Sequence, residues 1–207
     1  MAKLALNKSS LARESAQLAE FRRFLPSLEL KRLQVMAERA KARDVIRELD
    51  ATYERRFAEI GDSLPMLAND HIRLDGLVTI EKVERGEQNL SGTVLPTLGA
   101  VTLAETPYPR QANPHWVDPT VAGLKELVEL HLQREVARER YDLLIKAEAV
   151  ISRRVNLFEK VLIPQADRNI KKIRMALADA ERDAVVRAKI SKRKTAARAA
   201  EDRMAEL

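Results

Sequence analysis

Residues 152–173 read SRRVNLFEKVLIPQADRNIKKI, and their apolar positions recur at the spacing of an α-helix. The apolar stripe extends in both directions and comprises Ile151, Val155, Phe158, Leu162, Ala166, Ile170, Ile173, Leu177, Ala180 and Ala184. Pro164 lies inside it and is bracketed by three consecutive spacings of four residues. Such a run of fours locally unwinds a supercoil, and a proline, which lacks the backbone N–H, bends a helix. We therefore predict one long helix with a bend near residues 160–164.

The start of this helix is marked by Asp118-Pro119. Aspartate is favoured at the N-cap and proline at the first helical position. Beyond this pair only Pro164 interrupts the helical pattern. Residues 119–207 are therefore interpreted as a C-terminal coiled-coil helix, regular to about residue 200.

A second amphipathic helix is predicted over residues 10–60, within an N-terminal coiled-coil segment 1–60. Its apolar positions are Leu18, Phe21, Leu25, Leu28, Leu33, Met36, Ala40, Ile46, Leu49, Tyr53, Phe57 and Ile60. These positions shift in phase after Leu28, so the predicted seam is slightly wider than a strict heptad. Pro26 is expected to kink this helix or to divide it in two. Gly61-Asp62 is a plausible end.

The middle segment, residues 61–118, has a different composition, with five of the six glycines and five of the eight prolines. Residues 77–83 are rich in β-branched side chains, residues 86–92 have the composition of a turn, and residues 93–103 can return as a second strand. We predict a β-hairpin over residues 77–103, in which Pro96 confines its strand to an edge. A proline-containing connector follows, and Trp116 is expected to cover the core at this end.

Two long helices joined by a compact segment must bury their apolar faces. The fold class predicted is mainly α: a long antiparallel two-helix coiled coil with a small β-hairpin and loop region at the turn end. This arrangement places Ile60 near Val121. The C-terminal helix would then extend alone for roughly 30 residues, or ~45 Å.

Charge is unevenly distributed along the chain. Residues 1–60 carry a net charge of +4, residues 61–118 of −4 and residues 119–207 of +6. The basic ends and the acidic middle are therefore expected to face different partners. The chain has no cysteine, and no apolar run approaches the ~18 residues of a membrane span. A soluble intracellular protein is the prediction.

The sequence contains no catalytic, cofactor-binding or metal-binding constellation that we recognise. The phosphate-binding pattern GxxxxGK[ST] is absent, which disfavours ATP binding by this chain. His71, His115 and His131 lack the spacing of metal ligands. The basic stretch from Arg187 to Arg198 has six Lys or Arg residues and no acid. Taken alone, it indicates a solvated helix end favoured by the helix dipole.

Residues 152–194 resemble the D subunits of the V-type (A/V-type) ATPases and ATP synthases. That family shows Arg-Arg-Val-Asn-x-x-Glu, an Ile-Pro pair, Ile-x-x-Ile and a basic Arg-x-Lys-x-x-Lys end. The matching residues are Arg153-Arg154-Val155-Asn156, Glu159, Ile163-Pro164, Ile170 with Ile173, and Arg187, Lys189 and Lys192. Residues 28–33 are similar to the family's Leu-Leu-Lys-x-Lys-Arg, and Asn7-Lys8-Ser9 stands where the family has Pro-Thr-Arg.

The resemblance implies a non-catalytic central rotor shaft that turns inside a hexamer of catalytic A and nucleotide-binding B subunits. The partners implied are that hexamer, the F subunit and the funnel-shaped central-stalk subunit on the membrane ring. The location implied is cytoplasmic and peripheral to the membrane. The implied partner-binding residues are Lys8, Arg153, Arg154, Asn156, Glu159, Pro164, Arg168, Arg187, Lys189, Lys192, Arg193 and Lys194. From the residues alone, a coiled-coil adaptor and a basic nucleic-acid-binding coiled coil stay open as alternatives.

Overall fold

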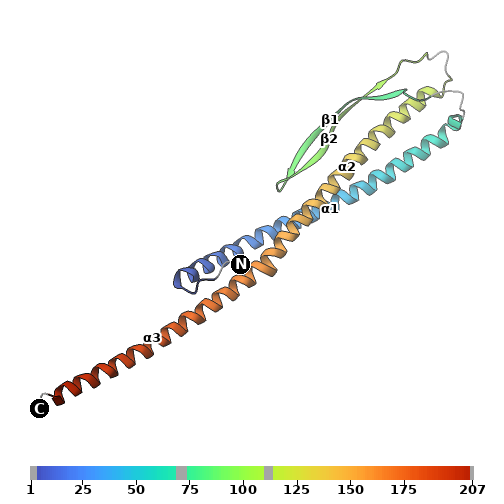
Figure 1. The fold of residues 1–207 in the computed structure, drawn as a ribbon. Coiled ribbons are helices and arrows are strands. Elements are labelled where there is room, and N and C mark those ends of the chain that lie inside the picture. Colours follow the sequence, from blue (N-terminus) through green and yellow to red (C-terminus); the bar gives the residue numbers. More distant parts are fainter. Residues whose placement is uncertain (1–3, 69–73, 110–113, 206–207) are drawn as a thin grey trace. The chain divides into compact units, whose positions relative to one another are not determined.

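The computed structural model describes residues 4–68, 74–109 and 114–205, with side chains as far as Arg198 (Figure 1). The chain order is α1 (Lys8–Ser63), a short 3-10 helix η1 (Pro65–Ala68), β1 (Val78–Leu90), β2 (Thr93–Glu105), α2 (Val117–Leu157), a π-helical turn η2 (Phe158–Leu162) and α3 (Ile163–Ala205). The prediction of a mainly α fold with a small antiparallel hairpin is confirmed.

The chain divides into two compact units. The terminal unit consists of Met1–Glu29 and Arg153–Leu207, and the hairpin unit consists of Leu30–Ser152. Lys and Arg outnumber Asp and Glu by 20 to 11 in the terminal unit, a net charge of +9, whereas the hairpin unit has 17 against 20, a net charge of −3. The charge contrast seen along the sequence therefore follows the division of the fold.

In the hairpin unit, α1 and α2 pack side by side and antiparallel. A Cβ placed on Gly123 would lie 2.8 Å from Cδ1 of Ile60, so the two helices approach closely there. The neighbour predicted for Ile60 is Val121, two positions away. Further along, the rings of Tyr53 and His131 are 6.4 Å apart. The antiparallel pairing continues in this direction, because Arg39 forms an ion pair of 2.8 Å with Glu148.

The face of α1 that is turned inward follows an unbroken heptad pattern. Its buried or half-buried positions are Leu11, Glu14, Leu18, Phe21, Leu25, Leu28, Arg32, Val35, Arg39, Ala42, Ile46, Leu49, Tyr53, Arg56 and Ile60. The predicted shift of phase after Leu28 is therefore wrong, because Leu33, Met36 and Ala40 are exposed. Phe57, also assigned to the seam, is 57% exposed.

Three arginines explain why the predicted seam is wrong. Arg32, Arg39 and Arg56 occupy heptad positions where an apolar residue is expected. An arginine can pack its aliphatic stem along an apolar surface while its charged head pairs elsewhere. The guanidinium of Arg39 pairs with Glu148, and that of Arg56 pairs with Glu126, both on α2.

Helix α2 is buried on two faces in the hairpin unit. The face toward α1 has heptad spacing and comprises Thr120, Gly123, Leu127, Leu130, Arg134, Ala137, Tyr141, Leu144, Glu148 and Ile151. Leu132 and Val136 are also buried but belong to the neighbouring face. Lys125 and Glu139, which share that second face, form ion pairs with Glu105 and Arg85 of the hairpin. The hairpin therefore supplies a second packing layer over α2.

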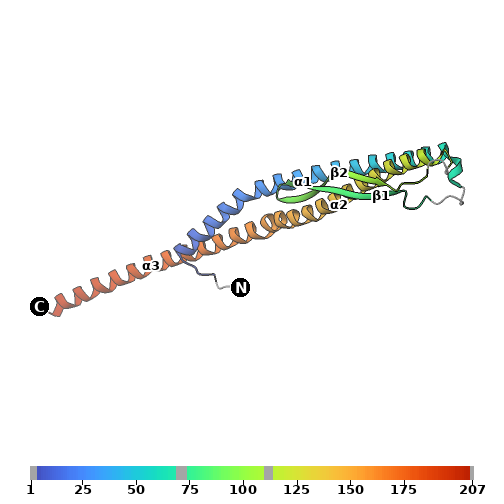
Figure 2. The same cartoon turned by 90° about the horizontal axis from the view of Figure 1, so that it is seen from above.

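Strands β1 and β2 form an antiparallel pair joined by the two-residue loop Ser91-Gly92. Both loop residues have positive φ, 51° and 82°, which is the requirement of a type I′ hairpin turn. The hydroxyl of Ser91 donates to the side chain of Gln34 on α1 at 2.7 Å. Figures 1 and 2 show the hairpin lying along the helix pair, whereas the sequence analysis places it at the turn end.

The turn end of the hairpin unit has its own core. Trp116, Val117 and Val121 are buried together, and Leu64, Leu74, Leu77, Val78 and Tyr108 pack against them. Trp116 is only 5% exposed, in agreement with its expected place in this core.

In the terminal unit, the start of α1 packs antiparallel on α3. Leu18 is buried against Ala166 and Ile170, with Leu11 and Ile163 beside them. An exposed ion pair joins Arg22 and Asp167 at 3.2 Å. Pro26 lies within α1, which continues as one helix through it. Of the two predicted outcomes, a kink or a division, the division does not occur.

The deformation expected near Pro164 takes the form of the π-helical turn η2. The backbone N–H of Ile163 donates to the carbonyl of Phe158, five residues earlier instead of four. Pro164 is the second residue of α3 and directly follows this wider turn.

Candidate interaction surface

The distal part of α3, residues 178–198, is exposed on every side. The buried face of α3 ends with Ile173, and Leu177 is half-buried. Pairing must end near here because α1 begins at Lys8, only a few residues before its first contacts with α3. The distal part of α3 therefore has no cover within the terminal unit, as the sequence predicts.

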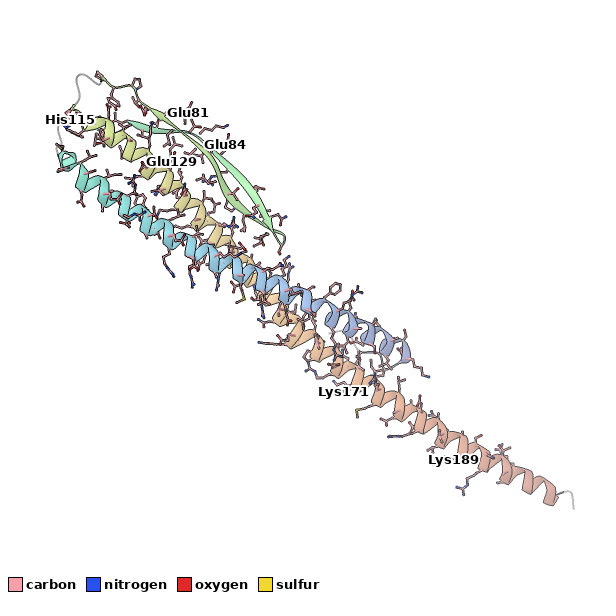
Figure 3. All side chains as sticks on the ribbon, turned by 180° about the vertical axis from the view of Figure 1, so that it is seen from behind. Glu81, Glu84, His115, Glu129, Lys171 and Lys189 are labelled. Carbon is pink, nitrogen blue, oxygen red and sulfur yellow. The ribbon has the colours of Figure 1, made fainter. Side chains whose placement is uncertain are left out.

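This exposed segment is basic on two opposite sides. At ~100° per residue, Arg187, Lys194 and Arg198 share one side of the helix. Lys189, Lys192 and Arg193 lie on the other side, and Figure 3 marks Lys189 on the exposed part of α3. No acidic residue occurs between positions 184 and 200.

We name the first group, Arg187, Lys194 and Arg198, the basic stripe. It borders a shallow depression on α3 that is also lined by Ile190, Ser191 and Thr195. Hydroxyl groups between the cations add hydrogen-bonding groups to the positive charge. This combination suits carboxylates on a facing protein surface.

Exposed apolar side chains accompany these cations. Val185, Val186 and Ile190 are 55%, 53% and 49% exposed. The sequence analysis does not select them, because it treats this end as a charged surface with an alanine stripe. Val186 and Ile190 are four residues apart and therefore lie one turn apart on the same side of the helix.

The remaining predicted site residues lie elsewhere on the terminal unit. Arg153, Arg154, Asn156, Glu159 and Arg168 are exposed, and Pro164 is half-buried. Glu159 belongs to the π-helical turn. The stretch from Arg154 to Arg187 covers ~50 Å of helix at ~1.5 Å per residue. The predicted residues therefore form two separate groups on one helix.

Lys8, the remaining predicted residue, is the first residue of α1 and is exposed. The helix begins here because the side chain of Asn7 accepts a hydrogen bond from the backbone N–H of Ser10 at 2.7 Å. This is the geometry of an N-cap. Asn7-Lys8-Ser9 thus has a structural role at the helix start.

The hairpin unit offers an apolar groove at its turn end. The groove has a volume of about 290 Å³ and is lined by Phe57, Ile60, Gly61, Leu74, Asp75, Thr120, Leu124 and Leu127. Phe57 remains more than half exposed in it. The sequence analysis assigns Phe57 to the coiled-coil seam and therefore misses this second surface.

A charged network crosses the α1–α2 interface of the hairpin unit. Arg134 donates to Asp50 at 2.6 Å, Arg138 donates to the same carboxylate at 3.0 Å, and the Arg134 guanidinium lies 4.2 Å from the Tyr53 ring centroid. The hydrogen bond from Arg134 lowers the pKa of Asp50 below its ordinary value. The network links the two helices.

Groups that could hold a metal ion, defined as three or more His, Cys, Asp or Glu together, are absent from the described residues. His115 and His131 are both exposed, and His71 lies outside the described residues. Within the described ranges, no helix has the length and hydrophobicity needed to cross a membrane.

Comparison with known proteins places this architecture in a family. The family model for the D subunit of ATP synthase matches residues 10–193. The chain is similar to the V-type ATP synthase D subunit of Borreliella burgdorferi, with 29% identity over 93% of this chain and 95% of the relative. The D subunits of the V-type ATP synthases of Chlamydia felis and Chlamydia pneumoniae are 35% and 33% identical over 92% and 91% of this chain, and 93% and 91% of their own lengths. The chain belongs to the family of ATP synthase D subunits.

Proposed function

We propose that this chain is the central-stalk rotor subunit of a V-type or A-type rotary ATPase. It couples ATP hydrolysis or synthesis in a hexamer of A and B subunits to ion translocation through a membrane ring. Membership of the D-subunit family supports this proposal. The paired helices supply stiffness, and the chain takes no part in the chemical step of catalysis.

The observation that carries the proposal is the exposed distal part of α3. Residues 178–198 have no cover, although Val185, Val186 and Ile190 are exposed there. An isolated helix is marginal in water, so this segment gains stability from a sheath of partner chains. Its cations, which lie on two opposite sides of the helix, suit acidic loops lining the hexamer. Exposed ion pairs contribute only ~0–1 kcal/mol each, so turning breaks no strong contact.

The partner-binding residues divide between partners in this proposal. The A and B hexamer contacts the distal cations of α3, which are Arg187, Lys189, Lys192, Arg193 and Lys194. The other predicted residues lie nearer the paired region: Arg153, Arg154, Asn156, Glu159, Pro164 and Arg168. Lys8 lies at the start of α1. The F subunit binds the paired region. The funnel-shaped central-stalk subunit meets the turn end of the hairpin unit, where the apolar groove beside Phe57 lies. The assembly is peripheral to the membrane on its cytoplasmic side.

Deletion of the residues from Lys189 onward tests this proposal. The truncated chain should bind the F subunit as the parent does, but assemble with the A and B subunits more weakly and with greater sensitivity to salt. A matched variant keeps the length and replaces the stripe by Arg187→Gln, Lys194→Gln and Arg198→Gln. Copurification and ATP-driven rotation are the measurements.

Unchanged assembly and rotation in both variants would show that the basic end is only a solvated tail. Loss of the F subunit from the truncated chain would show that the partners are assigned to the wrong ends. If the parent chain instead binds nucleic acid and does not assemble with A and B, the proposal is wrong.

A further inference from the structure

The apolar face of α3 contains one residue more than a coiled coil needs. Ile170 lies twelve positions after Phe158, in three consecutive steps of four. In a coiled coil, three alternating steps of four and three would place it about eleven positions after Phe158. In an uninterrupted α-helix, the extra residue would rotate everything beyond it by about 100°.

The π-helical turn removes this rotation. The hydrogen bond from Ile163 to Phe158 spans five residues, so the turn takes up one residue more than an α-helical turn. At the first residue of the turn, the ring of Phe158 meets the ring of Phe21 on α1, with centroids 5.5 Å apart. After it, Ile170 is buried against Leu18, also on α1. The same face of the helix is therefore turned to α1 at the start of η2 and after it.

Spacing, not Pro164, requires the turn. In an α-helix the proline ring would clash with the carbonyl four residues earlier, that of Lys160. The wider turn relieves this clash, so Pro164 is compatible with η2. Without the turn, however, Ala166 and Ile170 would leave the α1 face whether or not residue 164 were a proline.

The basic stripe lies on the same side of α3 as the buried face that precedes it. From Ile173, the last buried residue, to Arg187 there are fourteen residues of uninterrupted α-helix. At ~100° per residue, Arg187, Ser191 and Arg198 emerge within about 60° of the side on which Ile173 is buried. The stripe is thus aligned with the face that α1 covers further down.

We propose that the π-helical turn η2 sets the angular direction of the basic stripe. It keeps the stripe on the side of α3 that packs on α1, so that an acidic surface of the surrounding subunits meets the cations there. The identity of that partner rests on the proposed function. The angular relation between the stripe and the α1 face rests on the fold of the terminal unit alone.

The test removes the extra residue. Val161 lies in the turn and is 46% exposed, so its deletion takes away one residue and little packing. The deletion is combined with Pro164→Ala, because the proline ring would clash with the preceding turn of a regular α-helix. This variant should become α-helical through the turn while keeping the α1 contact and the stripe direction. Insertion of an alanine after Val161 is the opposite change, and Pro164→Ala should behave as the parent. Deletion of Met175, which is 68% exposed, keeps the α1 contact but rotates the stripe by about 100°.

Contact between α1 and α3 is measured in the full chain by cross-linking two cysteines that replace the ion-paired residues Arg22 and Asp167. The natural chain has no cysteine that would interfere. A short bis-maleimide should join the pair in the parent, in the Val161 and Met175 deletions and in Pro164→Ala, but not in the insertion variant. Loss of the cross-link on deleting Val161, or its retention in the insertion variant, would overturn the role of the turn.

The effect of the stripe's direction is measured as the affinity of each variant for the A and B hexamer. Both deletions are made in a background that carries Lys189→Gln, Lys192→Gln and Arg193→Gln, so that the stripe alone supplies the cations of this segment. In that background the Val161 deletion should bind within about twofold of its own parent, and the Met175 deletion about tenfold more weakly, equivalent to ~1.4 kcal/mol. Equal binding by both deletions would overturn the directional claim. If the parent itself fails to bind, the proposed function and the directional claim fall together, whereas the cross-linking result still decides whether η2 holds the α1 contact.

Discussion

The terminal unit and the hairpin unit use the same type of helix pairing in two different ways. In the hairpin unit, α2 is buried against α1 on one face and beneath the hairpin on the next. In the terminal unit, α3 has one buried face, and that face ends at Ile173. The hairpin thus covers a second face of α2, whereas the described part of α3 beyond Leu177 is exposed.

Truncation of a buried side chain in each unit should give the largest change in the free energy of unfolding among these tests. Leu144→Ala in the hairpin unit should lower the free energy of unfolding by about 2–5 kcal/mol, since the side chain is fully buried. Ile173→Ala in the terminal unit removes an equally buried side chain. It should cost less globally, because the end of the paired region can open locally.

Chemical denaturation measures the global effect, and amide hydrogen exchange measures local opening. Ile145→Ala, at a position that is 40% exposed, is the control for Leu144→Ala. Equal losses for Leu144→Ala and Ile173→Ala, with exchange changed across both units, would mean that the two units unfold as one.

Two glycines on the helices of the hairpin unit provide the next test. Gly123→Ala should destabilise by about 1 kcal/mol, because the steric cost of ~1–3 kcal/mol at Ile60 exceeds the ~1 kcal/mol gain in helix propensity. Gly61→Ala should stabilise by up to ~1 kcal/mol, since nothing lies within 4 Å of its added Cβ.

Thermal and urea unfolding of both variants supply the free energies. In an Ile60→Ala background, Gly123→Ala should change sign and become stabilising. Persistence of the loss in that background would show that the close approach of α1 and α2 at Gly123 is not its cause.

A smaller effect is expected from the charged network of the hairpin unit. The folded-state pKa of Asp50 is below its ordinary value of 3.8, chiefly through the hydrogen bond from Arg134. The Asp50 carboxylate therefore contributes to the free energy of unfolding above its unfolded-state pKa, and this contribution is lost as the pH falls through its folded-state pKa. It should not exceed ~1 kcal/mol, because the Asp50 side chain is 37% exposed.

Asp50→Asn should consequently be less stable than the parent at neutral pH, and the difference should shrink below pH ~4. Urea titrations at several pH values measure it. A difference that grows on acidification would assign the acid sensitivity to other carboxylates.

Removal of residues 189–207 should have the smallest effect on folding. Every described side chain from Lys189 to Arg198 is exposed, so the free energy of unfolding should stay within ~0.5 kcal/mol of the parent. Denaturation of the truncated chain measures this value. A loss of ~2 kcal/mol or more, on the scale of a buried side chain, would mean that the distal part of α3 is packed within the chain.

Much of the fold could be predicted because helix starts, hairpin composition and apolar spacing are local signals. The seam of α1 could not, since Arg32, Arg39 and Arg56 stand at heptad positions while Leu33 and Met36 point outward. Periodicity counts apolar residues, and it does not detect an arginine that packs its aliphatic stem in the seam. The extra residue near Pro164 can be recognised in the sequence from three consecutive apolar spacings of four residues. That the chain accommodates this residue in a π-helical turn depends on contacts with α1, which the spacings do not reveal.

The surface was predictable to a similar degree. The basic end from Arg187 to Lys194 follows from sequence alone, because no acid interrupts it. The groove at Phe57 does not, because Leu74 comes from a distant loop and Leu124 from the other helix. Contacts between residues far apart in the chain set this part of the site.

The pairing of the two chain ends has a consequence for synthesis. Arg22 and Asp167 are 145 residues apart, and Glu14 and Asn169 are 155 apart, whereas Arg56 and Glu126 are 70 apart. Doubling a loop adds ~0.6 kcal/mol to its closure, so the hairpin unit should assemble first and bring the ends together. The first turns of α1 leave the ribosome early but find their partner last. Leu11, Leu18 and Phe21 therefore stay uncovered during most of translation, and this interval is when the nascent chain most needs a chaperone.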